Sequence, residues 1–147
     1  MIRLVWAVLC RSASVDKTSN SLSMFDVAEE LKLLEPITQK GQAPIPLQLV
    51  TFWVRTNPSE PTKGVARTRL LLPSGEQIGK STDHQIDLTA HKRLRSMLTF
   101  GSFPIAEAGV HEFVTEISEP GGAWREVSRV PFEIEQQTEL AAPNEVH

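Results

Sequence analysis

The amino-acid sequence predicts an all-β fold, a single immunoglobulin-like β-sandwich of seven or eight mainly antiparallel strands. Most segments alternate apolar with polar residues, which is the period of strands buried on one face. Turn-forming residues separate these segments at near-regular intervals. Amphipathic segments long enough to form the helices of a βαβ unit are absent, apart from one ambiguous segment at 22–34.

The bulk properties fit one ordinary globular domain. The chain has 147 residues, of which 40% are hydrophobic and 22% are charged, so a core can form without disulfides or metals. The net charge of −3 gives no broad attraction to nucleic acid or acidic lipid, and we expect neither as a partner. Cys10 is the single cysteine, which excludes an internal disulfide and a thiolate metal cage.

The start of the chain is interpreted as the first strand. Residues 2–10 are apolar at almost every position, as expected of a strand covered on both faces. The apolar run is short for a signal peptide, and Leu9 stands where a cleavage site needs a small residue. No stretch has the length of a transmembrane helix, so we expect a cytoplasmic protein. A polar turn follows at 16–21.

The segment at 22–34 has two possible structures. Helical spacing relates Met24, Val27, Ala28, Leu31 and Leu34. With period two, the residues that share one face are Phe25, Val27, Leu31 and Leu33. Helix propensity favours the first structure, and the position directly after a hairpin-like turn favours a strand.

The rest of the chain alternates strands with turns. We expect strands at 47–55, 65–72, 78–88, 92–100, 110–117 and 124–135. We expect connections at 35–46, 57–64, 73–75, 101–109 and 119–122. The strand at 78–88 is weak and belongs at a sheet edge, and Pro131 requires an edge or a bulge because it has no N–H to donate. The domain spans 1–135, and the polar segment 136–147 is a flexible tail.

Two resemblances support this interpretation. The segments Ala108–Phe113, Pro120–Trp124 and Val130–Ile134 resemble the closing hairpin of immunoglobulin-like domains, with His111 in place of the usual aromatic residue. The order of segments over roughly residues 3–135 resembles a family of small uncharacterised bacterial proteins, a domain of unknown function. This resemblance is carried by Leu9-Cys10, Leu22–Leu31 and Leu72–Glu76, and it implies a strand rather than a helix at 22–34.

The segment Ser74–Thr82 contains Gly-Lys-Ser after an apolar strand, like a phosphate-binding loop. Such a loop needs four residues between its first glycine and the Gly-Lys pair, and only three separate Gly75 from Gly79. No convincing helix begins after Thr82 to supply amide donors. We therefore predict a simple turn between two strands.

The best candidates for metal ligands are Asp83, His84, Asp87 and His91. His84, Asp87 and His91 would share one face of a helix. On a strand, which the sequence favours here, His84 and Asp87 point to opposite sides. We predict a surface cluster rather than a metal site, and we assign no metal ligand or cofactor.

No catalytic residue is assigned either. His111 lies on a face with Phe113 and Ile117 and is predicted to be a partly buried, hydrogen-bonded histidine. Glu29 and Glu30 are adjacent, so their side chains diverge. Cys10 lies in an apolar strand, where a thiol is inert.

The sequence thus predicts a non-catalytic structural or protein-interaction module with a protein partner. Association of copies through an edge strand is one form of this hypothesis. A first alternative is a small-ligand-binding protein or hydrolase with a loop-assembled site that includes His84, Asp87 and His91. A second alternative is binding of an acidic partner through an arginine-bearing sheet face. It requires neighbouring strands that carry Arg67, Arg69, Lys92, Arg93 and Arg95.

Overall fold

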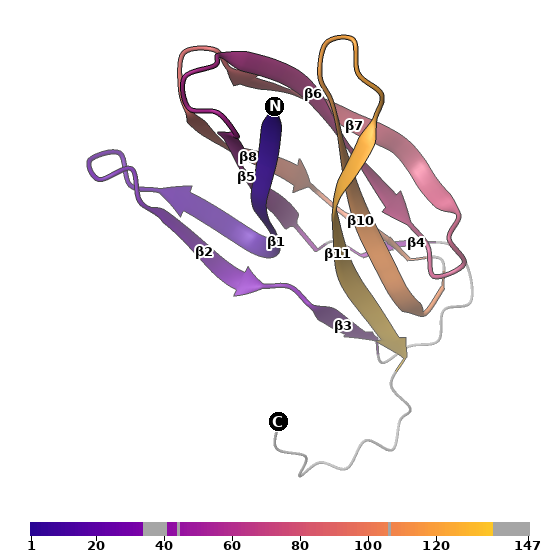
Figure 1. The fold of residues 1–147 in the computed structure, drawn as a ribbon. Coiled ribbons are helices and arrows are strands. Elements are labelled where there is room, and N and C mark those ends of the chain that lie inside the picture. Colours follow the sequence, from indigo (N-terminus) through magenta and orange to yellow (C-terminus); the bar gives the residue numbers. More distant parts are fainter. Residues whose placement is uncertain (34–40, 44, 106, 137–147) are drawn as a thin grey trace.

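The computed structural model describes residues 1–33, 41–43, 45–105 and 107–136, and these form two β-sheets packed face to face (Figure 1). The prediction of an all-β sandwich is confirmed. The described residues form eleven strands rather than seven or eight, and three of the eleven have only three or four residues. The strands are β1 (Ile2–Val15), β2 (Leu22–Val27), β3 (Glu30–Leu33), β4 (Gly41–Ala43), β5 (Leu47–Arg55), β6 (Thr62–Leu71), β7 (Gln77–Leu88), β8 (Arg93–Phe100), β9 (Phe103–Ile105), β10 (Gly109–Ser118) and β11 (Arg125–Gln136).

The first sheet has the strand order β2-β1-β5-β8, and the second has the order β3-β11-β10-β6-β7. Strands β4 and β9 form a separate two-stranded sheet. The pairing of β3 with β11 is parallel, and the other pairings in the described chain are antiparallel. The expected predominance of antiparallel pairs is therefore confirmed.

Within the described residues, the segment at 22–34 forms strands at Leu22–Val27 and Glu30–Leu33, and the helical alternative is wrong. β2 pairs with β1 in the first sheet, and β3 pairs with β11 in the second. The expected common face for Phe25, Val27, Leu31 and Leu33 is also wrong, because the two halves of the segment belong to different sheets. Phe25 and Val27 are 52% and 56% exposed.

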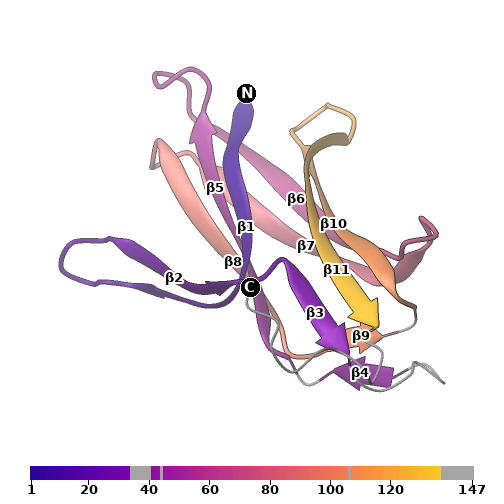
Figure 2. The ribbon, with the colours of Figure 1, turned by 90° about the horizontal axis from the view of Figure 1, so that it is seen from below.

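The chain crosses from one sheet to the other through Ala28 and Glu29. The Ala28 amide donates to the carbonyl of Leu9 in the first sheet, at 2.8 Å. The Glu133 amide donates to the carbonyl of Glu29 in the second sheet, at 3.0 Å. Each residue of the crossing is thus fixed to a different sheet. Figure 2 shows β2 continuing into β3 beside β11.

The core between the sheets consists of two apolar clusters. One contains Leu9, Leu47, Leu49, Phe103, Phe113, Phe132 and Ile134. The other contains Ile2, Trp53, Ala66, Ile86, Leu88 and Ile117. All of these side chains are at most 2% exposed. Burial of large aliphatic and aromatic side chains at this density is the main favourable contribution to the stability of the sandwich.

Buried threonines separate the two clusters. Along its own strand, each of these threonines lies between a residue of one cluster and a residue that packs with the other. They are Thr51, Thr68 and Thr115. Their hydroxyl groups are satisfied within this layer. Trp53 Nε1 donates to Thr51 Oγ1 at 2.8 Å, and the hydroxyls of Thr68 and Thr115 lie 3.1 Å apart. Buried polar atoms that are hydrogen-bonded in this way avoid a desolvation penalty.

The strand and the proline that were predicted to lie at sheet edges do so. β7 is the edge strand of the second sheet, as expected for 78–88, and β8 is an edge of the first. Pro131 lies in β11 and pairs with Glu112 of β10 on one side. On its other side the pairing with β3 begins only at Glu133, so Pro131 occupies an edge position as predicted. The described part of the chain contains no helix that is long and apolar enough to cross a membrane. Of the expected tail at 136–147, only Gln136 lies within the described residues.

Candidate binding groove

The β1–β2 hairpin closes with a tight polar turn at 16–21, as predicted. Asp16 Oδ1 accepts the amides of Thr18 and Ser19 at 2.7 and 3.1 Å. The two amides, that of Ser19 first, hold the pKa of this exposed carboxyl below its ordinary value. Asn20 adopts a left-handed backbone with φ of 58°, a conformation that asparagine tolerates better than most residues.

The hairpin projects from the body of the sandwich (Figures 1 and 2), and its tip is fastened to the opposite edge of the first sheet. Arg95 of β8 donates from Nη2 to the carbonyl oxygen of Asn20 at 2.7 Å and to its side-chain oxygen at 2.8 Å. β2 lies at one edge of this sheet and β8 at the other, so the arm spans the outer face of the sheet. Arg95 therefore keeps the arm over that face.

The strand register places side chains in rows across this outer face. Trp6, Phe52 and Arg95 stand opposite one another on β1, β5 and β8. The next row contains Arg3, Val54 and Arg93, and the row on the other side contains Val8, Val50 and Met97. Directly opposed residues share a face, so the three rows form one surface. The rings of Trp6 and Phe52 are tilted, with centroids 5.5 Å apart.

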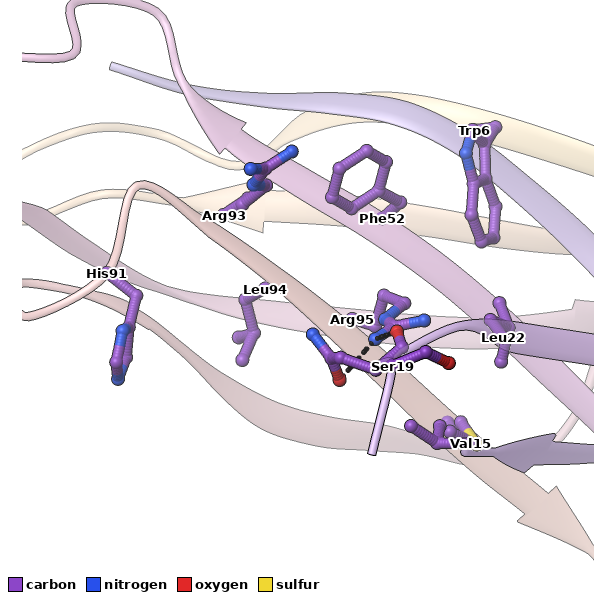
Figure 3. A pocket seen from close by; sticks show the side chains of 11 residues that line it. Trp6, Val15, Ser19, Leu22, Phe52, His91, Arg93, Leu94 and Arg95 are labelled. Atoms are coloured by element: carbon purple, nitrogen blue, oxygen red, sulfur yellow. Dashed lines mark hydrogen bonds between the residues drawn. The ribbon is translucent and has the colours of Figure 1, made fainter. Parts of the chain in front are cut away.

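A groove of about 710 Å³ lies between this surface and the hairpin (Figure 3). Trp6 and Phe52 lie side by side in it, Arg93 and His91 stand toward one end, and Val15 and Leu22 belong to the hairpin. Val50, in the row with Val8 and Met97, is fully buried. The expectation that the first strand is covered on both faces holds near Cys10 and fails at Val5, which is 41% exposed.

The groove is cationic. No aspartate or glutamate is among the described residues that line it, whereas Arg93, Arg95 and His91 are. Arg95 is engaged by neutral oxygens of Asn20. Arg93 makes no side-chain hydrogen bond or ion pair within the described part of the chain. Two guanidinium groups therefore face the groove without a carboxylate to balance them.

The outer face of the second sheet is different, because its arginines are neutralised. Arg67 and Arg69 both place Nε close to Glu116 Oε1, at 3.0 and 2.9 Å. The hydrogen bond from Arg67 is the main reason that the pKa of Glu116 lies below its ordinary value. The Arg67 guanidinium also lies 4.1 Å from the ring centre of Trp124.

Arg129 completes this ion network by contacting Glu112 at 3.2 Å and Glu126 at 2.8 Å. The two strands that carry the basic residues are not neighbours, so the single arginine stripe that the second alternative required does not form. Arg67 and Arg69 are on β6 in one sheet, and Arg93 and Arg95 are on β8 in the other. Only Arg93 and Arg95 line the groove, and the exposed Lys92 lies just outside it.

The four metal candidates do not form a site. In the described residues no three histidine, cysteine, aspartate or glutamate side chains form a group that could hold a metal ion. His84 is partly buried, with neither ring nitrogen hydrogen-bonded. Asp87 instead accepts from the amide and hydroxyl of Thr89, at 2.9 and 2.6 Å, and the hydroxyl is the leading cause of its lowered pKa. His91 lines the groove.

The other sequence candidates have structural roles. Gly75 lies in the β6–β7 turn, where its amide donates to the carbonyl of Leu72 at 2.8 Å, so the predicted turn is confirmed. His111 is fully buried, with Nδ1 3.2 Å from the carbonyl oxygen of Gly109 and its ring edge-on to Phe103. Cys10 is fully buried, and desolvation raises the pKa of its thiol.

Sequence reasoning missed Trp6 and Phe52 as parts of one surface. Their strands were predicted, but their alignment in one row depends on a β-bulge between Leu4 and Trp6 that shifts the register of β1. A signal was present in the sequence. Val50, Phe52 and Val54 make the second face of β5 apolar, which means that something must cover it.

A scan against models of protein families finds no match for this chain, and a search of curated proteins finds none either.

Proposed function

We propose that the protein is a non-catalytic interaction module that holds an extended segment of a partner protein in the groove under the β1–β2 hairpin. The observation that carries the proposal is the pair Trp6 and Phe52, half-buried side by side on an outer sheet face and flanked by Arg93 and Arg95. Aromatic and arginine side chains are the residue types most enriched at the energetically important points of protein interfaces.

The lining of the groove supports binding rather than catalysis. Ser19 and His91 both line it, but no hydrogen bond joins them in the described structure. The Ser19 hydroxyl instead accepts the amide of Ser21 at 3.3 Å. A serine nucleophile needs a base within hydrogen-bond reach, so this pair gives no support to the loop-assembled hydrolase.

The same proposal includes the cellular setting expected from the sequence. We place the protein in the bacterial cytoplasm, with the family of small uncharacterised bacterial proteins that its segment order resembles. The immunoglobulin-like character of the sandwich belongs to this proposal as well. The acidic chain, with a net charge of −3, favours a protein partner over nucleic acid.

The test is affinity capture with matched variants. Immobilised wild-type protein, Arg93→Glu, Phe52→Ala and Lys92→Glu are incubated with lysate of the native cell, and bound proteins are quantified by mass spectrometry. Lys92 is exposed and lies beside the groove without lining it, so Lys92→Glu controls for a change in net charge. We expect a partner that is retained by wild type and Lys92→Glu and lost from both groove variants. Equal retention by all four proteins would refute the groove as the binding surface.

Self-association through β2 is a second form of the proposal. Among the described strands, β2 is an edge of the first sheet, and it carries the exposed Phe25 and Val27. Pairing of two such edges would continue the sheet across two copies. Size-exclusion chromatography with light scattering, at high protein concentration, should give a dimer for wild type and a monomer for Phe25→Lys. A monomeric wild-type protein would exclude this form.

A further inference from the structure

We propose that the groove selects a partner segment in which an acidic residue and an aromatic residue are separated by one position, Asp/Glu-x-Phe/Trp in either chain direction. The inference rests on the proposed function, because it names the chemistry of the segment that the groove would hold. It follows from the charge of the groove, from the spacing of its rows and from the different roles of its two arginines.

Charge gives the first part of the argument. On the outer face of the second sheet, Arg67, Arg69 and Arg129 all have glutamate partners. In the groove, no carboxylate of the described chain lines the wall beside Arg93 and Arg95. A planar guanidinium binds a carboxylate through two parallel hydrogen bonds, which makes an acidic side chain its best-matched partner. The missing counter-charge is therefore expected from the bound segment.

Row spacing gives the second part. Arg93 lies opposite Val54 of β5. Two residues from Val54 on the same strand, Phe52 lies opposite Trp6, so the aromatic row is the next row on this face. Residues two apart on a strand are about 7 Å apart and point to the same side. Side chains at positions i and i+2 of an extended ligand have the same separation. A carboxylate that pairs with Arg93 thus places its second neighbour over the rings of Trp6 and Phe52.

The two arginines have different roles in this arrangement. Arg95 already holds the hairpin through Asn20 and acts as a positioning residue. Arg93 is exposed and makes no side-chain hydrogen bond or ion pair in the described structure, so its guanidinium is free to bind the ligand. Substitution of Arg93 can therefore test ligand recognition without releasing the hairpin.

The experiment measures binding of fluorescein-labelled peptides to the intact protein by fluorescence polarisation. The probe carries two Asp-x-Phe repeats, and the matched controls carry Asn-x-Phe and Asp-x-Ala. A labelled oligothymidylate serves as the competing anionic ligand. Arg93→Gln is compared with Arg129→Gln, which removes an arginine from the opposite face. We expect each control peptide to bind at least tenfold more weakly than the probe, Arg93→Gln to lose at least tenfold, and Arg129→Gln to match wild type.

The outcomes separate this inference from the proposed function. Equal binding of the Asp-x-Phe and Asn-x-Phe peptides would refute the acidic preference, while groove-dependent capture of a native partner would still support a binding module. Binding of oligothymidylate as tight as that of the probe would overturn the acidic-peptide inference in favour of nucleic acid. Unchanged probe binding by Arg93→Gln would place the contact elsewhere and refute the inference.

Discussion

Arg95 donates two hydrogen bonds to Asn20, at 2.7 and 2.8 Å, and through them joins an edge strand of the first sheet to the tip of a hairpin that starts at the opposite edge. The outer part of that hairpin pairs with no third strand in the described structure. A two-stranded ribbon alone is only marginally stable in water. The contact therefore contributes to keeping the ribbon formed over the groove.

Replacing Arg95 with Met should increase local opening of the hairpin. Loss of these charge-assisted hydrogen bonds is worth about 1 kcal/mol, which corresponds to roughly fivefold faster amide exchange in the strands next to the turn. Hydrogen–deuterium exchange over residues 13–24 measures this. Arg93→Met, on the same strand but without a side-chain hydrogen bond to the described residues of the hairpin, is the control. Equal exchange in the two variants would show that Asn20 does not anchor the arm.

Two histidines should make the fold less stable as the pH falls. Burial lowers the pKa values of His84 and His111 below the ordinary value of 6.5. Near and below pH 6.5 these two histidines bind protons more readily in the unfolded chain than in the folded protein. Unfolding therefore becomes more favourable as the pH falls. Above that pH both states are neutral at these positions and the effect vanishes.

Urea unfolding at pH 7.5 and pH 5.5 tests the histidine effect. We expect a smaller loss of stability between the two pH values in His84→Gln than in wild type, because one linked proton is removed. An identical loss in wild type and His84→Gln would contradict the assignment.

Truncation of two phenylalanines on strands should destabilise the fold to very different extents. Phe132 is 2% exposed and belongs to the first core cluster, so Phe132→Ala should cost about 3–5 kcal/mol of unfolding free energy. Phe25 is 52% exposed on β2 in the single chain, so at protein concentrations too low for association Phe25→Ala should cost less than about 0.5 kcal/mol. Chemical denaturation measures both values. A large loss at Phe25 would mean that this side chain is covered in solution.

Gly64 should tolerate no side chain. An added Cβ would lie 2.8 Å from the carbonyl oxygen of Ser118 and 3.1 Å from Cδ1 of Ile2. The backbone must shift to relieve such contacts, so Gly64→Ala should cost about 1–3 kcal/mol. Gly101 has open space at the same position, and Gly101→Ala should be close to neutral. Similar denaturation midpoints for the two variants would refute this packing argument.

Much of the fold was predictable because period-two alternation determines which segments are strands. The strands at 47–55 and 78–88, the turn at 16–21 and the edge position of Pro131 follow from local chemistry alone. The face of Phe25 was not predictable in this way. Alternation continues through Val27, but the crossing at Ala28 and Glu29 moves the next strand into the other sheet.

The groove could be predicted only in part. Lys92, Arg93 and Arg95 were recognised as basic residues of one strand, but the sequence could not show that Arg67 and Arg69 lie in the other sheet. Sheet membership depends on long-range pairing, which a local pattern does not encode. The position of the hairpin depends on Arg95 and Asn20, which are 75 residues apart in the chain.

The short crossing at Ala28 and Glu29 limits how far the hairpin can travel. Two extended residues span about 7 Å, so β2 cannot move further than that from β3 while Ala28 stays bound to Leu9 and Glu133 to Glu29. A larger swing of the arm must peel β3 from the end of β11. Mechanical load at the hairpin tip is thereby transmitted to β11, in the second sheet of the sandwich.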